Sequence, residues 1–207
     1  MERRQFSGLI LDFIGVLTSN MVEVIELFEA RERIRPGTFL RAWADPRGKE
    51  LYRALESGEI DQHAWNLGFG ALMQIDADNL MGRLLYDMYP AHEVMRVARQ
   101  ARSAGIRTAV LSNSLGRSPF DPYALHDLSG SFDVVVMSAQ LGIRKPDPAI
   151  FVHTLEQLGV PARECVFADD SEENLPAASK LGMTVIHALD EQITAANLRS
   201  LLGLPSA

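Results

Sequence analysis

Residues 8–13 read GLILDF, a short apolar run that ends at an aspartate, Asp12. Apolar runs of this length are typical of strands that are buried on both faces of a parallel sheet. Similar runs cover residues 107–111, 132–137 and 165–168, and a last one covers residues 184–187. The sequence therefore predicts a parallel sheet whose first strand has a carboxylate at its carboxyl end.

Helical segments alternate with these runs. Apolar residues recur at helical spacing over residues 93–104, 148–158 and 173–181, and a glycine follows at position 105, 159 or 182. A glycine at this place is a common signal for the end of a helix. Strands that alternate with helices of this length indicate right-handed βαβ units, so we expect an α/β fold with a doubly wound parallel sheet.

The segment 20–89 has a different pattern. Its apolar residues recur at helical spacing throughout, and it contains no strand-like run. We interpret it as a helical subdomain inserted after the first strand, with residues 1–19 and 90–207 forming the α/β core domain. Trp43 and Trp65 are predicted to lie in the interior of the insertion, whereas Glu56 and Glu59 are predicted to be solvated charges on a helix face.

Composition excludes several classes of partner. The 207 residues are 47% hydrophobic and 23% charged, with a formal net charge of −7. This balance suits a folded globular core. An acidic chain without a tract of lysine and arginine is unsuited to binding nucleic acid or an anionic membrane surface as its main partner.

The single cysteine, Cys165, excludes an internal disulfide and is predicted to be a buried core thiol. No apolar run is long enough to span a bilayer. The charged start of the chain is not followed by the apolar segment of a signal peptide, so we expect a cytoplasmic protein. The oligomeric state, monomer or homodimer, is left open.

Polar residues follow several of the predicted strands. Asp12 ends the first strand, Ser112 and Asn113 end the second, and Asp169 with Asp170 follows the fourth. A lysine, at position 145, follows the third strand in the sequence KPDP. Ligands of open α/β sheets bind at the carboxyl ends of the strands, so these side chains are expected to form one site.

The order of these segments resembles that of the haloacid dehalogenase-like hydrolase superfamily. The four similar segments are DFIGVLT at 12–18, LSNS at 111–114, KPDP at 145–148 and FADDSEEN at 167–174. The resemblance covers nearly the whole chain, and the insertion lies where the family's helical-cap members carry their cap. It implies an HAD-like core with an inserted helical cap.

The resemblance also implies a role for each residue of the site. Asp12 is expected to be the nucleophile and Ser112 to bind the phosphoryl group. Lys145 is expected to neutralise the negative charges of the nucleophile and of the phosphate. Asp169 and Asp170 are expected to hold Mg²⁺. The chemistry is consistent with these roles, because a carboxylate can attack phosphorus and form an acyl phosphate if positive charge offsets the meeting of two anions.

The same chemistry gives a set of ligands. Mg²⁺ prefers oxygen ligands and usually keeps several waters, so Asp12, Asp170 and the backbone carbonyl of Ile14 would suit it. A hydroxyl at Ser112 and a backbone amide near Asn113 can donate to phosphoryl oxygens. Substrate binding is therefore predicted for Ser112, Asn113 and Lys145.

Ile14 departs from the family's pattern. Phosphatases of this family usually carry a second aspartate two residues after the nucleophile, and it protonates the leaving group. Isoleucine cannot do so, and loss of a general acid typically costs about 10²–10⁴ in rate. A carboxylate of the inserted segment, Glu56 or Glu59, is the alternative source of this proton. Members that cleave carbon–halogen bonds also lack this acid, but they lack the metal-binding acids of the fourth segment as well.

Three functions remain open. The first is a Mg²⁺-dependent phosphatase that acts on a small phosphorylated metabolite. The second is a phosphate-binding or regulatory protein that has lost turnover, and the third, with less support, is a 2-haloacid dehalogenase-type hydrolase. Ile14 is the feature that separates the first two. The segment 114–127 receives no predicted role.

Overall fold

The computed structural model describes residues 5–124 and 126–205. Its centre is a parallel five-stranded sheet in the order β3-β2-β1-β4-β5. The strands are β1 (Gly8–Leu11), β2 (Arg107–Ser112), β3 (Val134–Met137), β4 (Cys165–Asp169) and β5 (Thr184–His187). The predicted doubly wound α/β fold is confirmed.

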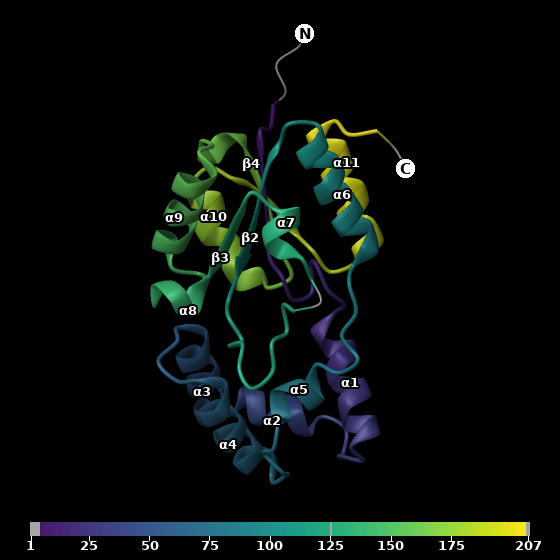
Figure 1. Ribbon diagram of the computed structural model, residues 1–207, viewed down its shortest axis with the longest axis vertical. Helices are drawn as coiled ribbons and strands as arrows, with labels where there is room; N and C mark the ends of the chain where they lie inside the picture. The colour runs from purple at the N-terminus through teal and green to yellow at the C-terminus, as the bar shows by residue number, and fades with distance from the viewer. Residues whose placement is uncertain (1–4, 125, 206–207) are drawn as a thin grey trace.

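Helices cover both faces of this sheet (Figure 1). One face carries α6 (His92–Ser103) and α11 (Glu191–Leu202), and the other carries α9 (Pro148–Leu158) and α10 (Leu175–Lys180). Each face has its own cluster of buried apolar side chains, because alternate strand residues point to opposite sides. Short helical turns lie in the connections: α7 (Leu128–Ser131), α8 (Ser138–Leu141), η1 (Ala162–Glu164) and η2 (Glu172–Asn174).

The insertion between β1 and β2 is helical and lies beyond the carboxyl ends of the strands (Figure 1). It contains α1 (Met21–Arg31), α2 (Thr38–Ala44), α3 (Pro46–Glu56), α4 (Gln62–Met73) and α5 (Leu80–Leu84). Its helices enclose a third apolar cluster, in which the Trp65 and Phe69 rings stack at 4.7 Å. The cap therefore has its own apolar cluster, to which Ile14, Leu115 and Phe120 of the core domain also contribute.

Most of the expected elements match the structure. β1, β5 and α9 have the predicted bounds, whereas the predicted helix over 173–181 begins with the 3-10 turn η2. Trp65 is fully buried as predicted, but the prediction for Trp43 is wrong, because that residue is 49% exposed. Helical spacing alone did not reveal that α2 turns this residue outward.

The chain passes between core and cap at a neck. An isolated antiparallel bridge joins Thr18 to Pro90, at the two crossings. This bridge lies close to the predicted domain boundaries, which stay a prediction. Among the described helices, none is both long enough and apolar enough to cross a membrane.

Candidate active site

The strand register brings the predicted site residues to one edge of the sheet. Leu11 of β1 pairs with Val110 of β2 and with Ala168 of β4. Asp12 therefore follows β1 at the level where β2 and β4 end, and its backbone N–H donates to the Ala168 carbonyl at 3.0 Å. The carboxyl ends of parallel strands thus gather residues that are far apart in sequence.

Lys145 lies at the centre of this cluster and is 1% exposed. Its Nζ lies 2.7 Å from Asp12 Oδ1 and 2.6 Å from Asp169 Oδ2. Burial alone would lower the pKa of Lys145, but the two carboxylates outweigh burial and hold that pKa above its ordinary value. The lysine therefore stays a cation at neutral pH.

Both oxygens of Asp169 have partners inside the protein. While Oδ2 accepts from Lys145, Oδ1 accepts from the backbone N–H of Ser171 and from Asn174 Nδ2, each at 2.9 Å. A carboxylate that is fixed in this way orients its lysine. Asp169 is thus the structural partner of Lys145, and its predicted contact with the metal stays a prediction.

Asp170 has a different environment. Among the described residues, no other residue donates a hydrogen bond to its carboxylate. Burial and the neighbouring Asp169 raise the pKa of Asp170 to about 6. Asp12, Asp169 and Asp170 each offer an oxygen, and these atoms lie within 4.8 Å of one another. Three carboxylates beside one ammonium leave an excess of negative charge, so the donor set fits a hard cation.

The carboxyl group of Asp12 is also affected by this excess of negative charge. Burial raises the pKa of its carboxyl, the nearby Asp169 and Asp170 raise it further, and Lys145 opposes both. The carbonyl of Ile14, the other predicted ligand, accepts no hydrogen bond within the described part of the chain. A cation at this place would therefore meet the Asp170 carboxylate and would stabilise the ionised form of Asp12. The contact with the Ile14 carbonyl stays a prediction.

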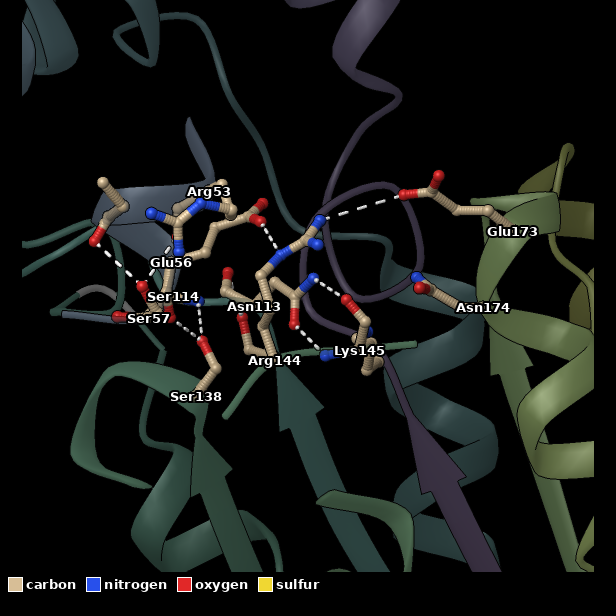
Figure 2. A network of polar contacts seen from close by, with 12 residues as sticks. Arg53, Glu56, Ser57, Asn113, Ser114, Ser138, Arg144, Lys145, Glu173 and Asn174 are labelled. Atoms are coloured by element: carbon tan, nitrogen blue, oxygen red, sulfur yellow. Dashed lines mark hydrogen bonds and ion pairs between the residues drawn. The ribbon is translucent and has the colours of Figure 1, made fainter. Parts of the chain in front are cut away.

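Asn113 holds the backbone of Lys145 on both sides. Its Nδ2 donates to the Lys145 carbonyl at 3.1 Å, and its Oδ1 accepts from the Lys145 N–H at 2.9 Å (Figure 2). The side-chain amide is thus occupied. One N–H of the side-chain amide remains besides the backbone N–H, and substrate binding by Asn113 stays a prediction.

Ser112 is 1% exposed, and its hydroxyl lies 3.4 Å from the hydroxyl of Tyr123. Tyr123 packs against Phe13 at a ring distance of 4.7 Å and accepts from the N–H of Leu115 at 3.3 Å. The segment 114–127, which received no predicted role, thus returns to the site and contacts the serine. A single tyrosine in a stretch rich in turn residues gives no sequence signal for such a contact.

The cap closes over the site with apolar and polar contacts. Ile14 packs against both the core cluster and the cap cluster. Gln62, which is 1% exposed, donates to the carbonyls of Leu115 and Phe120 at 2.9 and 3.0 Å and accepts from the Phe120 N–H at 2.9 Å. The segment after Ser112 is therefore attached to the cap.

A second prediction about the cap, after that for Trp43, is wrong. Glu56 is not a solvated charge: its side chain is 15% exposed and its Oε2 lies 2.5 Å from Arg144 Nε. Glu59 matches the prediction, because it is 54% exposed and pairs with Arg53 inside the cap. The partner of Glu56 lies 88 residues away along the chain, beyond the reach of helical periodicity.

Comparison with known proteins agrees with this site. Residues 6–182 match the haloacid dehalogenase-like hydrolase family. The match covers most of the chain, including the residues of the cluster around Lys145, and the chain belongs to this family.

Several curated proteins are similar to the chain. It is 29% identical over 98% of its length to acyl-CoA dehydrogenase family member 10 of Mus musculus, of which it covers 20%. It is 31% identical over 55% of its length to a sesquiterpene phosphatase of Aspergillus oryzae, covering 58% of that protein. It is 38% identical over 41% of its length to a phosphatase of Mycobacterium tuberculosis, covering 39%. The chain thus spans from a fifth to less than two thirds of these relatives.

Solved structures share the fold. An HAD-family enzyme of Bacteroides thetaiotaomicron, in complex with magnesium and inorganic phosphate, superimposes with a TM-score of 0.57 at 21% identity, covering 87% of this chain and 93% of that one. The L-2-haloacid dehalogenase of Xanthobacter autotrophicus gives a TM-score of 0.66 at 19% identity, covering 94% of this chain and 83% of that one. At these identities the likeness concerns the fold alone.

Proposed function

We propose that the chain is a Mg²⁺-dependent phosphatase that acts on a small phosphorylated metabolite through an aspartyl-phosphate intermediate. The observation that carries the proposal is that the three carboxylates of the site have different partners. Asp169 and Asp12 both contact the Lys145 ammonium, whereas Asp170 lies beside them and its oxygens are available to bind another cation. The similar phosphatases, and the phosphate and magnesium bound by the Bacteroides enzyme, support it.

The residues account for the first chemical step. A carboxylate oxygen of Asp12 attacks phosphorus, a new O–P bond forms, and the bond to the leaving oxygen breaks as that oxygen takes the electron pair. Lys145 and the hydroxyl of Ser112 bind the non-bridging phosphoryl oxygens. Water then attacks the acyl phosphate, which releases inorganic phosphate and regenerates Asp12.

The metal would complete the charge balance. Asp12, Asp170 and the carbonyl of Ile14 would hold Mg²⁺, which supplies positive charge where two anions meet. Lys145 alone faces two carboxylates and an incoming phosphate, so a second cation is required.

Ile14 limits the range of substrates. Ile14 stands where the family's phosphatases usually carry the aspartate that serves as general acid. Its apolar side chain packs against both the core cluster and the cap cluster and has no proton to donate. A leaving group that is already a weak base departs without a proton, whereas a simple alkoxide does not. We therefore propose acyl, pyrophosphoryl or aryl phosphates as substrates in preference to alkyl esters such as sugar phosphates.

A phosphate-binding protein without turnover is the second candidate, and the same isoleucine favours it. Both candidates need phosphate and Mg²⁺ at the site, and only the phosphatase releases product. A dehalogenase has less support, because it would have no use for the unpaired carboxylate of Asp170.

The test is a screen of phosphate esters and acyl phosphates with Mg²⁺ and with excess chelator, with Asp12→Asn as the matched control. Mg²⁺-dependent release of phosphate that is lost in Asp12→Asn supports the phosphatase. Tight binding of phosphate and Mg²⁺ without release of phosphate from any compound supports the binding protein instead. Release of halide from a 2-haloacid without metal would contradict both.

A further inference from the structure

Glu56 is the last residue of α3 in the cap, yet it contacts the core through both its side chain and its backbone. Arg144 donates to its carboxylate, and the hydroxyl of Ser138 donates to its carbonyl oxygen (Figure 2). These contacts leave Glu56 on the cap side of the network and the phosphate-binding segments on the core side.

The first contact leads to the lysine. Arg144 immediately precedes Lys145, whose backbone N–H and carbonyl are both hydrogen-bonded to the Asn113 side chain (Figure 2). Arg144 has one close partner, Glu56 at 2.5 Å, and one distant partner, Glu173 at 3.9 Å, whose side chain is 66% exposed. Glu56 is therefore the close partner of the Arg144 guanidinium, which belongs to the residue next to Lys145.

The second contact leads to the serine. The hydroxyl of Ser138 donates to Glu56 and accepts from the backbone N–H of Ser114 at 2.8 Å. Ser138 is fully buried, so water does not compete for these bonds. Ser114 lies two residues after Ser112, and Glu56 is thus linked to both segments that are expected to bind the phosphoryl group.

The turn that follows Glu56 is seated on the core independently of this residue. Gly58 has a φ of +73°, and a Cβ there would lie 2.7 Å from the Ala139 carbonyl oxygen. At the other end of the turn, Gln62 holds Leu115 and Phe120 by hydrogen bonds. Removal of the Glu56 charge is therefore expected to leave the cap docked.

We infer that Glu56 is a positioning residue that couples the seating of the cap to the assembly of Lys145 and Ser112 as a phosphate site. The inference rests on the proposed function, because it assigns the network to phosphate binding. When the cap is seated, Arg144 and Ser138 are fixed, and both phosphate-binding segments are held in register. Without the Glu56 charge, the segment that carries Arg144 and Lys145 gains freedom that a bound phosphate must remove, whereas the bond from Ser138 to the Glu56 carbonyl remains.

Charge alone predicts the opposite result, which makes the inference testable. Glu56 is an anion near an anion site, so a purely electrostatic effect of Glu56→Gln would strengthen phosphate binding. Positioning predicts that Glu56→Gln weakens it by roughly 5–150-fold, the usual range of coupling between sites. Two control variants remove a nearby charge without removing the Glu56 carboxylate. Glu173→Gln removes the distant partner of Arg144, and Glu59→Gln removes an exposed charge of the cap directly after Gly58. Both controls are expected to leave the affinity unchanged or slightly stronger.

The experiment measures the binding of inorganic phosphate by calorimetry at saturating Mg²⁺, with thermal unfolding of each variant as the check on folding. Glu56→Asp should recover part of the affinity, because it keeps the carboxylate. If Glu56→Gln does not fold, Arg144→Gln tests the same link from the core side. The loss of phosphate affinity in Arg144→Gln and the loss in Glu56→Asp should then be less than additive in the double variant.

The outcomes separate this inference from the proposed function. Wild-type affinity in folded Glu56→Gln, or stronger binding, overturns the inference and leaves the phosphatase intact. Absence of phosphate binding by the wild type overturns both. Where substrates are found, the inference also expects KM to rise more than kcat falls, because the positioned groups bind the phosphoryl group in the ground state as well.

Discussion

Gly15 and Asp170 lie in direct contact: a Cβ on Gly15 would come within 2.3 Å of Asp170 Oδ2. Gly15 also has a φ of +77°, a conformation that glycine adopts without strain. The backbone of the turn after β1 therefore lies directly against the Asp170 carboxylate. A side chain at this position would displace the one carboxylate of the site that no other residue engages.

Substitution of Asp170 tests the metal site. Asp170→Ala is expected to weaken Mg²⁺ binding about ten-fold or more, because interactions with charged groups are typically worth about 1.5–3 kcal/mol. Calorimetry with MgCl₂ on both proteins measures the change. Glu172→Ala is the control, because it removes an exposed charge near the site without touching the three carboxylates. Asp133→Ala would not serve, since that carboxylate pairs with two arginines. Equal affinities in Asp170→Ala and the wild type would remove Asp170 from the site.

Asp12→Asn should abolish phosphatase activity and leave thermal stability unchanged or raised. Asparagine keeps a hydrogen-bond acceptor for Lys145, and the substitution removes one anion from a buried group of three carboxylates. Differential scanning calorimetry and a phosphate-release assay measure the two effects. Turnover at the wild-type rate would show that another group attacks phosphorus.

Ile14→Asp should restore a general acid. The rate on alkyl phosphates is expected to rise more than the rate on aryl phosphates, by up to the ~10²–10⁴ that is typical of general acid catalysis. Burial between two apolar clusters would limit the gain, since it raises the pKa of the new carboxyl and constrains its rotamer. Ile14→Asn is the matched control, because it is polar and of similar size but cannot supply a proton in this way.

The measurement is steady-state kinetics on phosphate esters with graded leaving-group pKa. The wild type should show a steep dependence on that pKa, and Ile14→Asp a shallower one. A flat dependence in the wild type would mean that another residue protonates the leaving group.

The ion pair between Glu32 and Arg83 should make the stability of the cap depend on pH. Arg83 donates to Glu32 at 2.7 and 3.3 Å, and these bonds hold the pKa of Glu32 below its ordinary value of 4.5. A lowered folded-state pKa stabilises the fold above pH 4.5, and this contribution is lost as the pH falls through the folded value.

Thermal unfolding of the wild type and Glu32→Gln between pH 3 and pH 7 measures this contribution. The difference in Tm should be constant near neutral pH and should shrink below about pH 4.5, where the wild type loses its charge as well. Glu26, an exposed acid of α1 that forms no ion pair with the described residues, offers the control Glu26→Gln. A difference that persists unchanged at low pH would show that the pair contributes through packing alone.

The sequence determined the sheet and the chemical groups at its edge. The apolar runs that end at Asp12, Ser112 and Asp169 predicted β1, β2 and β4, because a strand buried on both faces needs a continuous apolar run. Since the carboxyl ends of parallel strands meet, the gathering of these residues with Lys145 also followed from the sequence. The replacement at Ile14 was visible in the same way.

Only the tertiary structure decided how these groups are paired. Nothing in the adjacent letters of Asp169 and Asp170 shows that one is bound by Lys145, Ser171 and Asn174 while the other stays unpaired. Likewise, the periodicity of α3 predicted a solvated Glu56, because periodicity describes the faces of a single helix. The pairing of Glu56 with Arg144 depends on how the cap docks on the core, and that contact joins residues far apart along the chain.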